Sequence, residues 1–256
     1  MNPFDLLYQE LDQWNFEGEQ AVFWWRDDDA QKNHPSLLRL VDLAGQYDVP
    51  LALAVIPAGS EHSLRELTER NPDLSLLQHG YQHRNHASKE EKKQELGAHR
   101  EHKLILAELQ KGFDMLKQVA GARMCPVLVP PWNRISPGLF PDLSKIGFKG
   151  ISCFGARKQS LASDDLWIVN THVDIIQWRP EKRFIGEKPA IGQLLSHLRD
   201  KRLDAADRAE PTGLLTHHLV HDEECWLFLK KLLSALDEHP AVTWLAAERV
   251  FQTRWR

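Results

Sequence analysis

Apolar residues recur along the chain in two alternating patterns, short unbroken runs and longer stretches with helical spacing. The runs are typical of strands buried on both faces of a parallel sheet. The stretches repeat apolar side chains every three or four residues, which is typical of helices packed on such a sheet. The predicted strands are 21–25, 51–56, 74–77, 126–129, 148–153, 167–174, 213–216 and 242–245, and the predicted helices are 4–14, 36–47, 63–70, 88–119, 137–146, 191–199 and 222–236, followed by a last short helix.

This alternation predicts an α/β fold whose parallel strands close into a barrel. Seven or eight strands separated by helices suit a (β/α)7–8 barrel at a length of 256 residues. No Pro/Gly/Ser linker, internal repeat or low-complexity tract divides the chain. We therefore expect residues 1–256 to form a single domain, with a lead-in helix in residues 1–19.

Polar clusters follow the predicted strands at one end only. The segments DDD, HGYQH, PPWNR, HVD and HH each lie at or just after the carboxyl end of a strand. Parallel α/β barrels build their active sites at this edge, whereas solvated turns would be shared between both edges. The clusters therefore predict one site to which several strands contribute.

Three consecutive aspartates, Asp27 to Asp29, end the first apolar run. Carboxylates that are buried without a partner are strongly destabilising, so a buried run needs a cation. Arg26 is one candidate cation and a metal ion is the other. The alternative is a solvated turn that caps the helix after Pro35.

Two histidines, His79 and His83, have HxxxH spacing, which on a helix places both imidazoles on one face at metal-binding distance. Gly80 stands where zinc proteases of the HExxH type have glutamate, so that class is excluded. A surface turn with incidental histidines is the alternative. With one aspartate of the run, the pair supplies either the three protein ligands of a catalytic zinc site or the facial triad of non-haem iron.

The composition narrows the function classes. With 32 basic and 36 acidic residues the formal net charge is -4, which predicts neither a nucleic-acid partner nor a membrane partner. The first residues are acidic and lack a basic segment followed by an apolar one, so no secretory signal is predicted and we expect a cytoplasmic protein. The three cysteines lack CxxC spacing and are expected to be reduced core residues.

Taken in order, the Asp run after the first strand, HxxxH, a PPW segment and a Leu-x-His near the end resemble the motifs of the polysaccharide deacetylase family, also called NodB-homology or carbohydrate esterase 4 proteins. The resemblance implies a distorted (β/α) barrel of the NodB-homology type and a divalent metal ion, usually zinc. It also implies a hydrolase of carbohydrate metabolism that removes acetyl from N-acetylated sugars, cleaving a carbon–nitrogen amide bond that is not a peptide bond.

The resemblance assigns the metal ligands and the base. The family's pair of aspartates falls on Asp28 as the catalytic base and Asp29 as a metal ligand, and a shift by one residue to Asp27 and Asp28 is the rival alignment. His79 and His83 become the other two ligands. In this arrangement the metal ion lowers the pKa of its water and Asp28 takes the proton.

The last strands supply the proton donor. The Leu-x-His motif falls on residues 215–217 and makes His217 the general acid that protonates the leaving amine, with His218 as the rival. Asp174 lies near the family's fourth motif and is expected to orient one of these histidines, unless it only caps a strand end.

One position departs from the family pattern. Where the family has the arginine that supports the base, this chain has Val129. We expect Arg26 to replace it by pairing with Asp28, because residues two apart on a strand share a face, and Arg134 is the alternative. Without either arginine the protein would be a carbohydrate-binding pseudoenzyme.

Trp132, Trp178 and Tyr81 are expected to contact substrate, because aromatic rings stack on the apolar face of a sugar, and Asn133 is a further expected substrate-binding residue. The expected partner is a carbohydrate or another N-acetylated small molecule. A third interpretation keeps the barrel and the metal but cleaves a different carbon–nitrogen bond, since a cytoplasmic enzyme does not meet cell-wall polysaccharide.

Overall fold

The computed structural model describes residues 2–252. The strands are β1 (Ala21–Ala30), β2 (Leu51–Val55), β3 (Leu74–His79), β4 (Met124–Val129), β5 (Gly150–Ile151), β6 (Leu161–Ser163), β7 (Leu166–Ile168), β8 (Val173–Asp174), β9 (Ile176–Gln177), β10 (Arg183–Phe184), β11 (Thr212–Thr216) and β12 (Val242–Trp244). In the described residues the main sheet has ten strands in the order β6, β7, β5, β4, β3, β2, β1, β11, β8, with β12 beside the start of β1. Strands β9 and β10 form a separate antiparallel pair.

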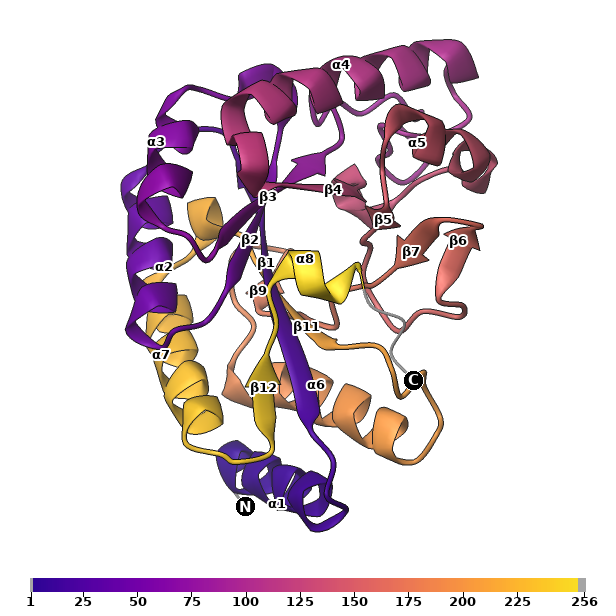
Figure 1. Ribbon diagram of the computed structural model, residues 1–256. Coiled ribbons are helices and arrows are strands. Elements are labelled where there is room, and N and C mark those ends of the chain that lie inside the picture. The colour runs from indigo at the N-terminus through magenta and orange to yellow at the C-terminus, as the bar shows by residue number, and fades with distance from the viewer. Residues whose placement is uncertain (1, 253–256) are drawn as a thin grey trace.

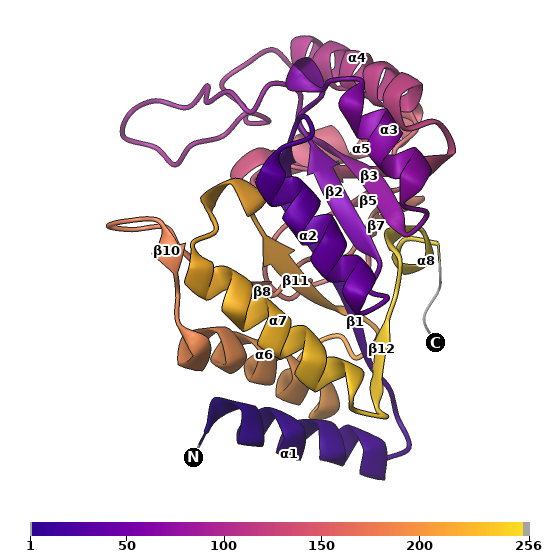
Figure 2. The same cartoon turned by 90° about the vertical axis from the view of Figure 1, so that its left-hand side faces the viewer.

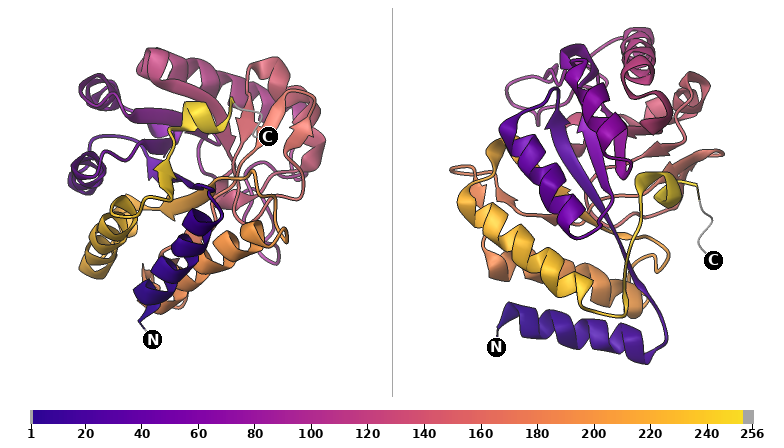
Figure 3. Two further views of the ribbon diagram at one scale, coloured as in Figure 1. Left: turned by 60° about the horizontal axis from the view of Figure 1, so that its bottom comes forward. Right: turned by 60° about the vertical axis from the view of Figure 1, so that its left-hand side comes forward.

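Most of the described helices lie on the outer face of this sheet, whereas the last one, α8 (Ala247–Val250), lies across one end of it and packs with Trp24 (Figure 1 and Figure 3). The others are α1 (Pro3–Phe16), α2 (Pro35–Gln46), α3 (Ser63–Arg70), α4 (His102–Ala120), α5 (Phe140–Ile146), α6 (Glu187–Arg202) and α7 (Glu223–Asp237). The lead-in helix α1 begins after Asn2, whose side chain accepts from the N–H of Phe4, and it packs against α6. Asp222 caps α7 in the same way through the N–H of Cys225. Within the described residues no helix is both long and apolar enough to cross a membrane.

The sheet curls round, and its end strands β6 and β8 are not paired with each other in residues 2–252. The segment between β7 and β8 nevertheless lies between β5 and β11, because Thr171 forms an isolated parallel bridge with Phe154 and the N–H of His172 donates to the carbonyl oxygen of Gly213 at 2.7 Å. Only β6 and β7 are antiparallel; the other neighbours in the main sheet are parallel. The prediction of an α/β fold with a distorted barrel is therefore confirmed, in the form of a curled sheet.

Strand β1 is longer than the prediction of 21–25, because it continues through the aspartates to Ala30. Asp27 and Asp28 are buried within it, so the interpretation of the run as a solvated turn is wrong. Asp29 has a positive φ of 72°, and the pairing with β2 shifts register between Asp27 and Ala30. This bulge turns Asp29 out of the regular alternation of side chains.

The predicted helix 88–119 is wrong in its first half, since α4 begins only at His102. Ser88 and Glu91 do interact at the spacing of a capping box, through Ser88 Oγ and Glu91 Oε2 at 2.9 Å, but they close an isolated turn. Glu95 is buried and accepts from the N–H groups of Tyr81 and Gln82. This tertiary contact holds the segment as a loop against the end of β3.

Glu210, just before β11, connects to the segment before β6 and to the segment between β7 and β8. Its carboxylate accepts from the N–H of Arg157 and from that of Asn170, both at 2.9 Å. The imidazoles of His172 and His197 stack beside it with ring centroids 3.4 Å apart. Burial lowers the pKa of both imidazoles, that of His197 to about 2, so the stacked rings are neutral.

We expect the stability of the fold to decrease as the pH falls below about 6.5, the ordinary pKa of histidine. Below that pH the unfolded chain binds a proton at His172 and at His197, whereas both rings stay neutral in the folded chain. The free energy of unfolding therefore decreases by about 1.4 kcal/mol per pH unit for each ring. The measurement is urea unfolding between pH 5 and pH 8. His197→Asn, which keeps an acceptor for the Thr212 hydroxyl, should flatten this pH dependence.

Leu198→Ala is the matched control, because Leu198 is buried next to His197 and carries no titratable group. It should lower the free energy of unfolding equally at every pH. If His197→Asn has the same slope as the parent, the neutral state of the stacked pair is not the cause.

Candidate active site

The carboxyl ends of β1, β3 and β11 lie on the same side of the molecule (Figure 2), where the turn Pro131–Asn133 after β4 joins them. The parallel register places Asp27 of β1 beside Thr216 of β11 and His79 of β3 beside Val129 of β4. The strand ends thus bring the DDD, HGYQH, PPWNR and HH segments to one place.

Asp29, His79 and His83 form the centre of this site. Asp29 Oδ1 lies 3.4 Å from His79 Nε2 and 3.5 Å from His83 Nε2. Ligands held about 2.0–2.1 Å from a tetrahedral zinc ion are about 3.3–3.4 Å apart, so these spacings fit a metal ion between the three atoms. Asp29 Oδ1 is also buried without a hydrogen-bond partner. Asp29, not Asp27 or Asp28, is the aspartate placed with the two histidines.

The HxxxH segment is a tight turn, and the prediction of two histidines on one face of a helix is wrong. His79 ends β3, while Gly80 and His83 have φ values of 54° and 55°. A side chain at Gly80 would collide with Glu95 and Pro131. The turn, closed by the Glu95 carboxylate on its N–H groups, brings the two imidazoles together with ring centroids 5.0 Å apart.

The ring orientation of His79 suits a metal ligand. Its Nδ1 lies 3.0 Å from the carbonyl oxygen of Val129, which can only accept, so Nδ1 carries the hydrogen and Nε2 has a free lone pair toward Asp29. Burial opposes charge on Asp29, but His79, His217 and His83 together hold the pKa of that carboxyl below its ordinary value. The pocket therefore stabilises positive charge at the point where the three atoms converge.

His172, His197 and Glu210 form a second group of possible metal ligands, at the amino ends of β8 and β11. There His172 Nδ1 accepts from the N–H of Gly213 at 2.9 Å, so its ring hydrogen is on Nε2, the atom that would have to bind the metal. The nearly parallel stacking of the two rings also prevents both lone pairs from pointing at one ion. This cluster does not fit a metal centre.

Arg26 and Asp28 form a buried ion pair, as expected. Arg26 Nε lies 2.8 Å from Asp28 Oδ1, and Nη2 lies 3.1 Å from Oδ2, in a forked arrangement with side-chain exposures of 0% and 3%. Arg26 also donates to Ser152 Oγ at 2.7 Å and to Asn133 Oδ1 at 2.9 Å. Arg134, the alternative partner, donates instead to the backbone oxygen of Lys93.

His217 and His218 occupy different environments. His217 Nε2 lies 3.9 Å from Asp28 Oδ2. His218 is buried and its Nδ1 pairs with Asp27 Oδ1, while Asp27 Oδ2 accepts from the N–H of His218 and from the Thr216 hydroxyl. Burial opposes the charge on His218, but the Asp27 carboxylate raises its pKa. His217 therefore faces Asp28, while His218 and Asp27 form a separate buried pair.

Asp174 does not orient either histidine by a hydrogen bond. Its carboxylate accepts from Trp178 Nε1 at 2.7 Å and from the N–H of Ile176 at 3.0 Å. Trp178 in turn stands edge-on to His217 with ring centroids 4.6 Å apart. Asp174 thus positions a tryptophan, and the tryptophan packs on His217.

Of the predicted substrate-binding rings, Trp132 and Trp178 are available at the site. Trp132 is partly exposed and packs on His83 with ring centroids 4.4 Å apart, and Trp178 has 40% of its surface exposed. Tyr81 is buried beneath Lys111, so the expectation for its ring is wrong. Asn133 Oδ1 accepts from Arg26, and the binding of substrate by Asn133 stays a prediction.

Glu95 and Ser152 are site-supporting residues that the sequence analysis did not single out. Glu95 closes the histidine turn and Ser152 holds Arg26. Glu95 lies in a run of charged residues that has the composition of a solvated surface, and Ser152 lies in an apolar run. No local pattern distinguishes them, because their partners come from other strands.

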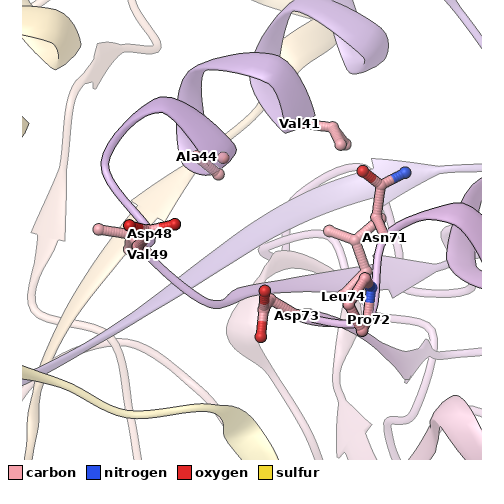
Figure 4. A pocket seen from close by; sticks show the side chains of 9 residues that line it. Val41, Ala44, Asp48, Val49, Asn71, Pro72, Asp73 and Leu74 are labelled. Atoms are coloured by element: carbon pink, nitrogen blue, oxygen red, sulfur yellow. The ribbon is translucent and has the colours of Figure 1, made fainter.

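A hollow of about 70 Å³ lies at the opposite edge of the sheet, between the end of α2 and the turn before β3 (Figure 4). It is lined by Val41, Ala44, Gly45, Asp48, Val49, Asn71, Pro72, Asp73 and Leu74. The lining contains no histidine, cysteine or aromatic residue, and it is not part of the candidate site.

Comparison with known proteins establishes the fold. No family model and no curated protein matches the sequence. The structure of peptidoglycan deacetylase PdaC from Bacillus subtilis is 11% identical, with a TM-score of 0.57 over 91% of this chain and 90% of that one. A family 4 carbohydrate esterase from Streptomyces lividans in complex with acetate is 13% identical, with a TM-score of 0.56 over 91% and 95%. A family 4 acetyl xylan esterase from Clostridium thermocellum in complex with a cobalt ion is 14% identical, with a TM-score of 0.52 over 90% of each chain.

We expect Arg26→Met to destabilise the protein far more than Asp28→Asn. The first change leaves a buried carboxylate unpaired, which costs about 3–5 kcal/mol. The second leaves Arg26 with Ser152, Asn133 and backbone acceptors, so the loss should be about 1–2 kcal/mol. Urea unfolding of both variants in the presence of a chelator measures the difference. Equal losses of unfolding free energy in the two variants would show that Ser152, Asn133 and the backbone acceptors do not compensate the charge of Arg26.

Proposed function

We propose that this chain, which has the fold of the polysaccharide deacetylases and family 4 carbohydrate esterases, is a metal-dependent hydrolase that removes acetyl from an N-acetylated sugar or a related amide. One observation carries the proposal. The three converging atoms of Asp29, His79 and His83 lie at the same strand ends as the Arg26–Asp28 pair and His217. A ligand set, a base and an acid at one point are the parts that amide hydrolysis requires.

Asp29 Oδ1 and the Nε2 atoms of His79 and His83 would hold the ion, most simply Zn²⁺. A divalent ion bound there supplies Lewis acidity, which polarises the acetyl carbonyl and makes water a better nucleophile. The Clostridium thermocellum esterase, which has the same fold, was solved in complex with a cobalt ion, and this supports a metal ion in a protein of this fold.

Asp28 acts as the general base in this proposal. Its carboxylate is fixed by the Arg26 fork, and because each carboxylate oxygen has two lone pairs, one remains to accept the proton of the attacking water. Arg26 takes the role of the arginine that Val129 replaces. Val129 instead packs in the core, and its carbonyl oxygen holds His79.

His217 donates the proton to the leaving amine. Its Nε2 lies 3.9 Å from Asp28 Oδ2, within the same group of side chains as the proposed base. The turn Pro131–Asn133 holds Trp132 at φ 56°, and the N–H of Trp132 is the proposed donor to the oxygen that becomes negatively charged.

We expect the protein to bind about one divalent ion per chain. His79→Ala and His83→Ala should each weaken binding by at least about 10-fold, because each removes one of three protein ligands. Isothermal titration with Zn²⁺ measures the affinity. His86→Ala is the matched control, since His86 belongs to the same segment but lies outside the ligand cluster, and it should bind as the parent does. Unchanged affinity in both ligand variants would exclude this site.

Release of acetate from N-acetylated sugars by the Zn²⁺-loaded protein tests the activity. Asp28→Asn should abolish it, and His217→Ala should lower kcat by about 10²- to 10⁴-fold with loss of the alkaline limb of the pH profile. The limb is lost because a general acid must be protonated when the amine leaves. If His218→Ala removes the limb instead, His218 is the acid. Metal binding without any acetate release would favour a carbohydrate-binding pseudoenzyme or another carbon–nitrogen substrate.

A further inference from the structure

A lysine ammonium group lies over each of the two partly exposed tryptophan rings at the site. Lys93 Nζ lies 5.9 Å from the ring centroid of Trp132, which packs on the ligand His83. Lys182 Nζ lies 5.4 Å from the ring centroid of Trp178, which packs on His217. One ammonium group therefore lies beside the proposed metal ligands, and the other lies beside the proposed general acid.

The two lysines lie on segments that are basic in a chain that is acidic as a whole. Residues 84–100 contain five basic and three acidic residues, and residues 177–183 contain three basic and one acidic residue, while the formal net charge of the chain is -4. Figure 2 shows both segments extending from the same side of the molecule, one between β3 and α4 and the other beside β10. Each of these two segments therefore adds a net positive charge on the side of the molecule where both extend.

Hydrogen bonds fix the backbone at Lys93 and the ring of Trp178. Arg134 Nη1 donates to the backbone oxygen of Lys93 at 2.9 Å, which ties the first segment to the turn that carries Trp132. Asp174 Oδ2 accepts from Trp178 Nε1 at 2.7 Å, which fixes the second ring. The side chains of Lys93 and Lys182 themselves are exposed and available to a ligand.

We propose that the substrate is an anionic N-acetylated sugar, one that bears a phosphate or carboxylate group close to its acetamide. This inference rests on the proposed function and specifies its substrate class. The sugar ring packs against a tryptophan while the anionic group meets Lys93 or Lys182, which act as point charges. The basic segments also raise the local concentration of an anion, and salt screens this attraction.

The test measures the binding of three sugars to Zn²⁺-loaded Asp28→Asn protein. This variant should not cleave them, so binding is measured apart from turnover. N-acetylglucosamine is the neutral sugar, N-acetylglucosamine 6-phosphate carries a phosphate, and N-acetylmuramic acid carries a carboxylate. At least one anionic sugar should bind about 10-fold or more tightly than the neutral one, and added NaCl should reduce that ratio. The anionic sugar that binds better identifies the charged group. Equal or tighter binding of the neutral sugar overturns the inference.

A double variant separates the lysines from the metal ion, which also attracts anions. Lys93→Met with Lys182→Met keeps the apolar stems and removes both charges, and it should bring the ratio close to one. Lys230→Met, at an exposed position on α7, is the control and should leave the ratio unchanged. An anion preference that survives in the double variant would place the anion on the metal ion and overturn the inference. Failure of the parent protein to release acetate contradicts the proposed function alone, since the binding ratio is measured independently.

Discussion

Three adjacent carboxylates at the end of the central strand β1 impose the constraint on which the site depends, because two of them are fully buried and each needs a separate compensating charge. Asp27 pairs with His218 from the end of β11. Asp28 pairs with Arg26 from its own strand. Asp29, turned aside by the bulge, is left with His79 and His83 and has an unpartnered oxygen between them. The first two carboxylates are thus neutralised by protein, and the third is free for an ion.

The origin of the arginine shapes the rest of the site. Because Arg26 lies two residues before Asp28 on one strand, its guanidinium can reach across to Ser152 and to Asn133 in the turn after β4. Asn133 thereby links the proposed base to the turn that presents Trp132, so both keep a fixed relation without an arginine at position 129. Val129 is then free to serve the core, and its backbone orients His79.

Shared fold and shared chemistry are separate conclusions for this protein. Structures of deacetylases and esterases that are 11–14% identical superpose over nine-tenths of the chain, which establishes the curled sheet. The chemistry is argued from atoms of this chain. The two groups of possible metal ligands show why. His79 Nδ1 donates its hydrogen to a carbonyl oxygen, so its Nε2 has a free lone pair. His172 Nδ1 accepts from a backbone N–H, so its Nε2 carries the hydrogen and cannot bind a metal ion.

The sequence alone determined the alternation of strands and helices, the parallel sheet and the edge at which the polar clusters meet, because these follow from local periodicity and from the direction of parallel strands. It also indicated the Arg26–Asp28 pair, since side chains two apart on a strand share a face. It did not indicate the short strands β6, β9 and β10. Only the tertiary structure decided which aspartate joins His79 and His83, because that depends on a bulge in β1 and on a turn closed by Glu95. The same contact stops residues 88–101 from forming the helix that their capping residues favour. Tyr81 was likewise assigned to substrate by residue type, whereas the tertiary structure buries its ring. The local pattern of apolar residues determines where helices and strands form, whereas the pairing of buried charges depends on residues that are distant in sequence.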